Sequence, residues 1–481
     1  MSKIYVFGIG GTGSRVLRSL TMLLAAGVEC KADTIVPIVI DSDSAGGDVE
    51  RTATLMRHYG EIRRKLDFGK HLENQFFRTE IREITSNYHL PLSNVEDCLF
   101  EDYIEYPSMK RENQALVNVL FSQQNLHADM QVGFKGNPNI GSVVLNQFED
   151  SEIFQNFANE FTADDKIFII SSIFGGTGAS GFPLLLKTLR ENRDIPNQNL
   201  VNNAHIGAVT VLPYFKVRQD DSSAIDSATF VSKAKSALAY YYRSISQNHT
   251  IDNLYYIGDD TRSTTYKNCE GGINQKNNAH FVEMAAALSI IDFANTEKPM
   301  ETRHKEFGIE KDVNEIIFDI LGPRTNSQVR RGMTQFMLFA KYMDEAGDYL
   351  RQPWSKDRQL DSTFFNSDFI RNLKRNILDQ YRHWLAEMDA QDRKFTPFTF
   401  PYSYDRNDEI VVEKGRTDRV FDLVKGVKPR KLFTTDSNYY LFDNRLNGTR
   451  GNSRSGAKEQ QFMELFYLAT KRLANEKLNI N

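Results

Sequence analysis

The residue pattern with the clearest chemical meaning is a pair of glycine-rich segments. The first reads GIGGTGS at residues 8–14, and the second reads SSIFGGTGASG at residues 171–181. Each follows a short run of β-branched residues and precedes a helical pattern. Glycine allows backbone N–H groups to approach phosphate oxygens, and a helix N-terminus adds a favourable electrostatic field. The two segments therefore predict two phosphate-binding loops.

We expect the two loops to act on one ligand, because loops that follow different strands of one parallel sheet meet at its carboxyl edge. No lysine of the Walker type follows either loop, so phosphate charge would be met by Mg²⁺ and backbone N–H groups. We expect Gly11→Val and Gly178→Val each to abolish triphosphate binding, whereas folding should survive both substitutions. The candidate ligand contacts in the two loops are Gly10, Gly11, Thr12, Gly13, Ser14, Gly175, Gly176, Thr177, Gly178 and Ala179.

The first loop alone has other interpretations. The spacing of Gly8, Gly10 and Gly13 also matches the dinucleotide fingerprint, in which Asp41 would hold a ribose. A tight turn without a ligand is the simplest alternative. A NAD-binding domain has no use for the second loop, and no catalytic His/Cys constellation is evident in the sequence. A Rossmann-type NAD(P) oxidoreductase is therefore a second alternative function.

The elements around these loops predict an α/β fold. Short β-branched runs occur at residues 4–7, 35–40, 166–171, 206–212 and 254–257. Several are apolar throughout, which is typical of parallel strands covered on both faces. Helical patterns follow at residues 14–26, 180–190, 224–243 and 278–293. We expect a doubly wound, mostly parallel sheet of the Rossmann type, with residues 48–131 inserted as loops and helices.

The sequence changes character after residue 295, so we predict a nucleotide-binding domain over 1–295 and an α+β C-terminal domain over 296–481. Residues 313–321 and 333–339 are strand-like, and residues 368–388 form a long amphipathic helix. The apolar residues of that helix are most simply core or partner-helix contacts. Residues 402–456 predict a loop-rich tail before a last helix at 458–473.

Composition excludes several classes of protein. Lys plus Arg number 59 against 63 Asp plus Glu, so the net charge of −4 provides no general attraction for nucleic acid. The three cysteines lack metal-type spacing. No apolar run is long enough to span a bilayer, and the N-terminus does not read as a signal peptide. We expect a cytoplasmic protein without a transmembrane segment.

The second loop also carries a family resemblance. GGTGASG at residues 175–181 resembles the signature loop GGGTG[ST]G of the tubulin/FtsZ family, and similar loops follow the family order over residues 1–295. Residues 8–14 resemble its first phosphate loop. DSD at residues 41–43 resembles its second loop, which implies that Asp41 and Asp43 help to place ribose and metal, with Asp43 as the Mg²⁺ ligand.

Two further segments extend the resemblance. GFKGNPNIG at residues 133–141 is similar to the GxGGNPxxG loop that senses the γ-phosphate, which implies contacts from Gly136 and Asn137. Lys135 there would add a cation or lie as a solvated surface lysine. VTVLPYF at residues 209–215 resembles the strand end beside the sugar, which implies a contact from Pro213. A prokaryotic source is expected for a divergent protein of this kind.

The resemblance also implies the residues near the base. Ser14 stands where FtsZ carries Asn, and Asp259 stands where its base-recognition loop carries Asn. A carboxylate at Asp259 can accept hydrogen bonds from guanine, which is compatible with GTP. At the start of the family's central helix, His280 or Phe281 would stack on the base and Glu283 would bond it. A buried, satisfied His280 and an exposed Glu283 are the alternatives.

In the family, the water-activating acid lies after the central helix and acts on the neighbouring subunit. IDFAN at residues 291–295 superficially resembles the family motif NLDFAD, with Asp292 as the first acid. A helix starting near residue 278 would then have only about four turns. A longer helix would place the loop near residues 297–301, so we favour Glu297 or Glu301 over Asp292, which is more simply a helix-face carboxylate.

These patterns together favour a tubulin/FtsZ-like protein that binds GTP or GDP with Mg²⁺, assembles with itself into an oligomer or filament, and hydrolyses GTP slowly in trans. The alternative is a non-polymerising regulatory or scaffold module. In that module, nucleotide occupancy would change how the C-terminal domain is presented to an unidentified protein partner.

Overall fold

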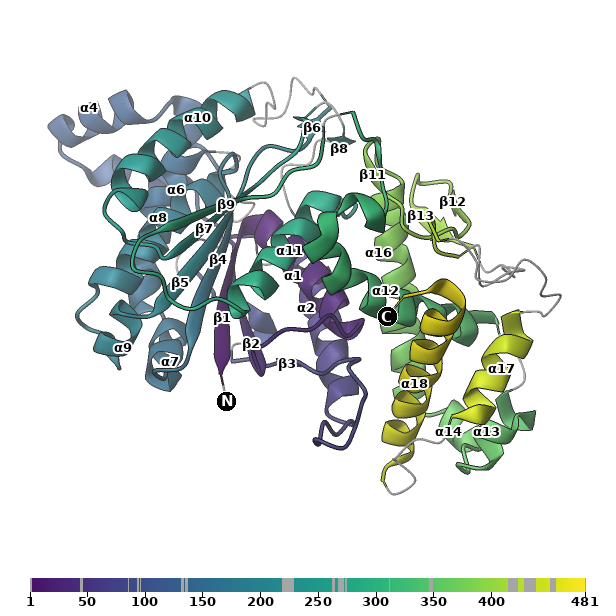
Figure 1. The fold of residues 1–481 in the computed structure, drawn as a ribbon. Coiled ribbons are helices and arrows are strands. Elements are labelled where there is room, and N and C mark those ends of the chain that lie inside the picture. Colours follow the sequence, from purple (N-terminus) through teal and green to yellow (C-terminus); the bar gives the residue numbers. More distant parts are fainter. Residues whose placement is uncertain are drawn as a thin grey trace.

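The computed structural model describes residues 2–43, 46–84, 86–92, 95, 97–130, 134, 137–218, 229–261, 264–266, 272, 275–310, 312–345, 349–413, 423–427, 438–449 and 456–480. Its centre is a parallel sheet of seven strands in the order β3-β2-β1-β4-β5-β7-β9 (Figure 1). The predicted doubly wound, mostly parallel sheet is therefore confirmed. The strands are β1 Lys3–Ile9, β2 Thr34–Ile40, β3 Glu80–Ile81, β4 Lys166–Ser172, β5 His205–Val211, β7 Asn253–Ile257 and β9 Arg303–Glu306.

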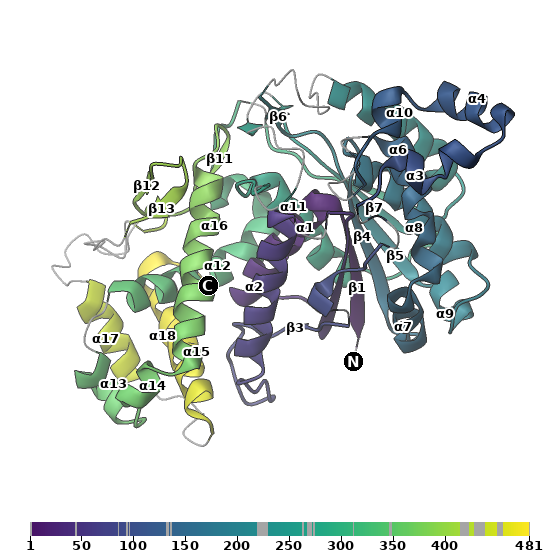
Figure 2. The same cartoon turned by 180° about the vertical axis from the view of Figure 1, so that it is seen from behind.

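Helices cover both faces of the sheet, which explains why β2 and β5 are buried at every position (Figures 1 and 2). Those on one face are α1 Gly10–Ala25, α2 Gly47–Arg63 and α11 Phe281–Ala294. Those on the other are α6 Pro138–Val144, α7 Glu152–Glu160, α8 Gly176–Glu191, α9 Gln198–Asn202 and α10 Phe230–Tyr241. Residues 224–228 of the predicted helix 224–243 lie outside the described residues.

Helix α11 is apolar on all sides, and every residue from Val282 to Ala294 except Ala285 is buried. It joins β7 to β9 and packs against α1. The step from β7 to β9 runs along the sheet in the same direction as the step from β4 to β5, but α11 lies on the opposite face from α8. This crossover connection is therefore left-handed, which is the less common handedness between parallel strands. It brings the first turn of α11 back to the carboxyl edge of the sheet beside α1.

An insertion follows β3 and carries α3 Phe100–Tyr103, α4 Arg111–Leu120 and α5 Gln123–Leu126. Helix α4 projects from the molecule, and none of its residues is buried (Figure 1). Short strand pairs lie outside the main sheet, namely β6 Lys216–Val217 with β8 Thr265–Tyr266, β10 Glu315–Ile316 with β11 Lys394–Phe395, and β12 Tyr402–Tyr404 with β13 Ile410–Val412.

The C-terminal region is mainly helical and packs on the α1 and α2 side of the sheet (Figure 2). The predicted strand-like run 333–339 is wrong, because it lies inside the long helix α12, whose apolar residues pack in the core. The predicted helix 368–388 is confirmed as one helical path with a π-helical segment at Asn372–Leu378. The helices are α12 Gly322–Glu345, α13 Pro353–Lys356, α14 Ser362–Phe365, α15 Asp368–Arg371, α16 Asp379–Asp389, α17 Asn438–Gly448 and α18 Lys458–Leu478.

The C-terminal helices share the hydrophobic core of the sheet region. Phe76, in the segment between α2 and β3, packs against Phe336 of α12 at 5.1 Å and Tyr467 of α18 at 5.2 Å. The Glu464 carboxylate of α18 accepts the backbone N–H of Glu73 at 2.8 Å. None of the described helices is long and apolar enough to cross a membrane.

Candidate nucleotide site

The two glycine-rich loops come together at the carboxyl edge of the sheet. They follow β1 and β4, which are neighbours at the point where the strand order changes direction. Crevices at such switch points are the usual ligand sites of open α/β sheets. A Cβ atom placed on Gly10 would lie 3.5 Å from the Thr177 Cβ and 3.8 Å from the Gly178 nitrogen. The structure therefore brings the two predicted loops into direct contact.

The glycines of these loops have different structural roles. A Cβ on Gly13 would lie 2.5 Å from the Gly8 carbonyl carbon, and one on Gly178 would lie 2.6 Å from the Ser172 carbonyl oxygen. Both positions are thus required for close packing of helix on strand. Gly11 is partly exposed, and among the described residues its Cβ would meet only Arg15, at 3.5 Å. Gly11 is the glycine whose absent side chain leaves space in front of the loop.

Both loops present uncapped helix N-termini. Helix α1 begins at Gly10 and α8 begins at Gly176, and neither has a side-chain hydrogen bond at its N-cap. The first-turn N–H groups of an α-helix have no partner within the helix. Two such turns facing one crevice suit a ligand with several anionic oxygens.

Buried hydroxyl groups add to this polarity. The Oγ atoms of Ser14, Ser42 and Ser171 are buried and have no hydrogen-bond partner among the described residues. Ser14 begins the second turn of α1, Ser42 follows β2, and Ser171 lies near the end of β4. Buried polar groups in proteins are normally hydrogen-bonded, so three unpaired hydroxyls at one edge fit a polar ligand.

The acidic loop after β2 lies at the same edge. Asp41 and Asp43 are buried, and Asp43 accepts the Gly272 N–H at 2.5 Å. Burial raises the pKa of Asp41 to about 7, despite a hydrogen bond from the Asp43 N–H. Burial also raises the pKa of Asp43. Within the part of the chain that the structure describes, no cation pairs with Asp41, so its carboxylate fits a bound metal ion.

Mg²⁺ in nucleotide sites is commonly held by one or two carboxylates together with phosphate oxygens. Asp41 and Asp43 match that donor set. The described residues contain no group of three or more His, Cys, Asp and Glu side chains that would form a metal cage. The metal would therefore enter with the phosphates, and the predicted ligand Asp43 remains a prediction.

The loop expected at the γ-phosphate is described in part. Gly136 and Lys135 lie outside the described residues. Asn137 caps α6 by accepting the Asn139 N–H at 3.2 Å. A Cβ on Gly141 would lie 2.2 Å from the Ser180 Oγ, so α6 packs tightly on the first turns of α8. This end of the predicted loop therefore adjoins the second glycine-rich loop.

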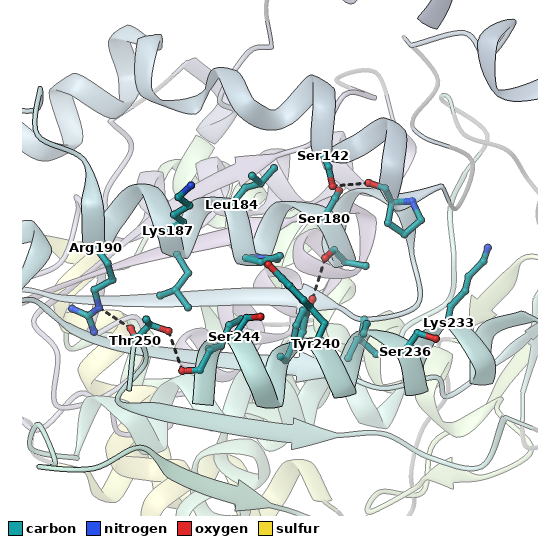
Figure 3. Close-up of a pocket in the computed structure, with 18 of the residues that line it drawn as sticks. Ser142, Ser180, Leu184, Lys187, Arg190, Lys233, Ser236, Tyr240, Ser244 and Thr250 are labelled. Carbon is teal, nitrogen blue, oxygen red and sulfur yellow. Dashed lines mark hydrogen bonds between the residues drawn. The ribbon is translucent and has the colours of Figure 1, made fainter. Parts of the chain in front are cut away.

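A groove of about 720 Å³ lies beside the second loop, between α8 and α10 (Figure 3). Ser180 and Lys187 line it from α8, and Ser236 and Tyr240 line it from α10. The Tyr241 hydroxyl donates to the Ala179 carbonyl at 3.1 Å. Ala179 is thereby held by α10.

The residues expected at the base are engaged within the protein. His280 is fully buried and caps α11, where its Nδ1 accepts the Val282 N–H at 3.0 Å. Burial lowers the pKa of His280 to about 4. Glu283 is also fully buried, not exposed, and accepts the Tyr214 hydroxyl at 2.6 Å and the Arg15 Nε at 2.6 Å. His280 and Glu283 are therefore not presented to a ligand in this arrangement.

The remaining expected base and sugar contacts differ among themselves. Asp259 is buried and forms an ion pair with Arg393, which lies outside the predicted nucleotide-binding domain. Phe281 is partly exposed and stacks on Phe395 at 6.2 Å. Pro213 is partly exposed after β5. Phe281 and Pro213 keep surface for a ligand, whereas Asp259 would first have to leave Arg393.

Arg15 and Tyr214 occupy the space between the first loop and α11, and sequence reasoning did not predict their roles. In the sequence, Tyr214 is one residue of the run 209–215, and Arg15 follows the glycine motif without a spacing that identifies its partners. Both side chains are fully enclosed, and the Arg15 Nη2 donates to the Tyr214 hydroxyl at 3.1 Å.

The candidate acids lie at the opposite end of α11. The helix is 14 residues long and ends at Ala294, so Glu297 and Glu301 lie in the following loop, and both are exposed. Asp292 is buried in the last turn, where it pairs with Lys305 at 2.5 Å and accepts the Tyr255 hydroxyl at 2.7 Å. Asp292 is a stabilising carboxylate on the helix, whereas the roles of Glu297 and Glu301 remain predictions.

Comparisons with known proteins bear on the fold. No protein-family model and no curated protein matches the chain. Among solved structures, the GTPγS-bound CetZ2 protofilament from Haloferax volcanii matches at 15% identity and TM-score 0.29, over 62% of this chain and 60% of that chain. The GDP-bound CetZ1 monomer from Haloferax volcanii matches at 13% identity and TM-score 0.31, over 61% of each chain.

A GTPγS-form TubZ protofilament from Bacillus thuringiensis serovar israelensis matches at 13% identity and TM-score 0.29, over 80% of this chain and 82% of that chain. These matches fall in the tubulin/FtsZ-like group that the loop motifs resemble, and they concern the fold alone. The chain spans about 60% of the length of the CetZ proteins that it matches. Since the TM-scores lie below 0.5, we argue function from the contacts of this chain.

Proposed function

We propose that this chain binds a nucleoside triphosphate with Mg²⁺, GTP as first choice, at the crevice between β1 and β4. The observation that supports this most strongly is the meeting of two uncapped, glycine-rich helix N-termini, where Gly10 approaches Thr177. One such loop is common to many folds, but two on adjacent strands suit a chain of phosphates. The unpaired hydroxyls of Ser14 and Ser171 and the carboxylate of Asp41 favour the same ligand.

We further propose that the bound triphosphate promotes self-association and is hydrolysed slowly between subunits. The exposed acids Glu297 and Glu301 lie past the end of α11, remote from the helix N-terminus that faces the loops. An acid in that position can reach a γ-phosphate only on another copy of the chain. The alternative is a regulatory or scaffold module, which is supported by the close packing of the C-terminal helices on α1 and α2.

The test is calorimetric titration of the full chain with GTP, ATP and NAD(P), each with and without Mg²⁺, followed by light scattering with the ligand that binds. Micromolar binding of a triphosphate that requires Mg²⁺ is the expected result. Preferential binding of NAD(P) would overturn the proposal and favour the oxidoreductase. Triphosphate binding without any concentration-dependent scattering or turnover would favour the scaffold module.

A further inference from the structure

A buried network of charged side chains extends from the first glycine-rich loop to the C-terminal helix α16. It contains three arginines and three carboxylates, so its formal charges balance. Each residue has a relative exposure below 9%, except Arg51, whose side chain is 22% exposed. The six members, from helices α1, α2, α11 and α16, are Arg15, Arg18, Arg51, Asp48, Glu283 and Glu387.

Arg15 forms the end of the network at the loop. Its Nε donates to Glu283 at 2.6 Å, and its Nη1 donates to Asp48 at 3.0 Å. Its Nη2 donates to the Thr12 hydroxyl, within the glycine motif, at 3.3 Å. The guanidinium thus fixes the first turn of α1 against α2 and the start of α11. Any shift of Arg15 would move the turn whose N–H groups face the crevice.

Glu387 forms the far end, on a helix more than 360 residues away in the sequence. Its carboxylate accepts hydrogen bonds from both Nη atoms of Arg18, at 2.5 and 3.1 Å, and from Nη1 of Arg51 at 3.1 Å. It also accepts the Ala279 N–H at 2.7 Å, directly before the cap of α11. Burial alone would raise the pKa of Glu387, but Arg18 and Arg51 overcome this effect and hold that pKa well below its usual range.

Asp48 joins the two ends. Its Oδ2 pairs with Arg15 and its Oδ1 pairs with Arg51 at 2.9 Å, while Arg51 also donates to the Asn277 carbonyl at 2.6 Å. The order of contacts is therefore Thr12, Arg15, Asp48, Arg51 and Glu387, without a gap. Each contact is a charge-assisted hydrogen bond, the stronger class of protein hydrogen bonds.

We infer that Glu387 is a positioning residue for the first phosphate loop, so that the C-terminal helix α16 forms part of the nucleotide site. Without the Glu387 charge, Arg18 and Arg51 lose a buried counter-ion, and Arg51 turns fully to Asp48. Asp48 then neutralises Arg15 less well, and the first turn of α1 loses its fixed geometry. In enzymes, misplacement of a positioned group by about 1 Å is enough to lower the reaction rate about a hundredfold, so small shifts of this turn are expected to matter.

This inference depends on the proposed nucleotide site, and one measurement tests it without a ligand. The variant is Glu387→Gln, which keeps the side-chain shape. The matched control is Asp344→Asn, because Asp344 of α12 pairs with Arg382 of the same helix α16 at 2.6 Å, and both side chains are 3% exposed. Both variants remove one carboxylate charge from a buried ion pair of α16, but among the described contacts only those of Glu387 continue through Arg51 and Asp48 to Arg15.

We expect hydrogen exchange of the amides in residues 10–16 to increase in ligand-free Glu387→Gln and to remain unchanged in Asp344→Asn. We also expect Glu387→Gln to weaken Mg·GTP binding at least about tenfold, with Asp344→Asn within about twofold of the wild type. Arg51→Lys keeps the charge but loses the fork that joins Asp48 to Glu387, and it replaces Glu387→Gln if that variant does not fold.

The outcomes are distinct. Equal exchange and equal affinity in Glu387→Gln and Asp344→Asn would overturn the positioning role and leave the nucleotide site intact. A wild-type chain that binds no triphosphate would overturn the proposed function, whatever the exchange data show. Increased exchange in residues 10–16 without any loss of triphosphate affinity would show that the network holds the loop but does not serve binding, and would also overturn the inference.

Discussion

The sharpest test of the phosphate loops is Gly11→Val. Gly11 lies in the first turn of α1 and is partly exposed. Among the described residues, an added Cβ would meet only the Arg15 Nη1, at the ordinary contact distance of 3.5 Å. Its φ is outside the left-handed region. Folding stability should therefore change by no more than about 0.5 kcal/mol, the usual range away from packed features.

Binding should respond far more strongly. The valine methyl groups would stand beside the first-turn N–H groups, where a phosphate must approach closely. A hydrogen bond to a charged group contributes about 1.5–3 kcal/mol, so loss of two such bonds weakens affinity by at least about a hundredfold, or about 2.7 kcal/mol.

Gly178→Val should behave differently, contrary to the expectation from the sequence that both substitutions preserve folding. A Cβ at Gly178 would lie 2.6 Å from the Ser172 oxygen and 2.8 Å from the Ser172 nitrogen. These are backbone atoms of β4 that cannot move aside cheaply. We expect a loss of more than about 2 kcal/mol of folding stability, as for overpacked cores.

The assay combines urea denaturation with calorimetric titration of Mg·GTP. Gly60→Val in α2 serves as the control, because no atom of the described residues lies within 4 Å of a Cβ placed on Gly60. It introduces the same residue into a helix remote from the crevice and should leave affinity unchanged. If Gly11→Val folds normally and binds GTP as tightly as the wild type, the assignment of the first loop is wrong.

Three further predictions follow from the site. Burial raises the pKa of Asp41 from 3.8 to about 7, so the ligand-free protein should lose folding stability as the pH rises from about 4 to 7. Mg·GTP binding should strengthen from about pH 6 to 8 and release a proton. Calorimetric titration in buffers of different ionisation enthalpy should show this proton release, and Asp41→Asn should abolish it. Asp259→Ala breaks a buried ion pair and should lower the free energy of unfolding in urea by about 3–5 kcal/mol. The milder Asp259→Asn should therefore be used to compare the affinities for GTP and ATP, and an equal change in both affinities would exclude recognition of guanine by Asp259. GTP turnover per molecule should increase with protein concentration and fall in Glu297→Gln or Glu301→Gln, whereas Asp292→Asn should lower stability and spare turnover; concentration-independent turnover untouched by all three changes would favour the scaffold module.

The sheet and its loops could be predicted because their signals are local. An apolar run bounded by a glycine-rich turn, as at residues 166–181, specifies strand, loop and helix within a few residues. The parallel arrangement follows from helices that alternate with such strands. The same reasoning failed at residues 333–339, because a short apolar run has no period that separates a buried strand from a buried helix.

The base end of the site could not be predicted, since it depends on contacts between distant segments. A glutamate at the third position of a helix reads as a capping-box residue or as a free carboxylate, and Glu283 does form the capping box with His280. What removes it from the ligand is Arg15, which lies 268 positions away in the sequence. No local pattern encodes such a pairing.

The buried network bears on whether the C-terminal region is an independent domain. A boundary near residue 295 predicts that the C-terminal region is a separate unit that responds to the nucleotide from outside. Instead, Glu387 of α16 is buried against Arg18 of α1, the helix that begins at the first glycine-rich loop. A charge that stays buried cannot lose its partner without a large free-energy cost, so α16 cannot move away from α1 while that pair is intact. If the proposed nucleotide site is correct, we expect a signal that uses this network to be a rearrangement of partners among Arg18, Arg51 and Glu387, and not a hinge opening between independent domains.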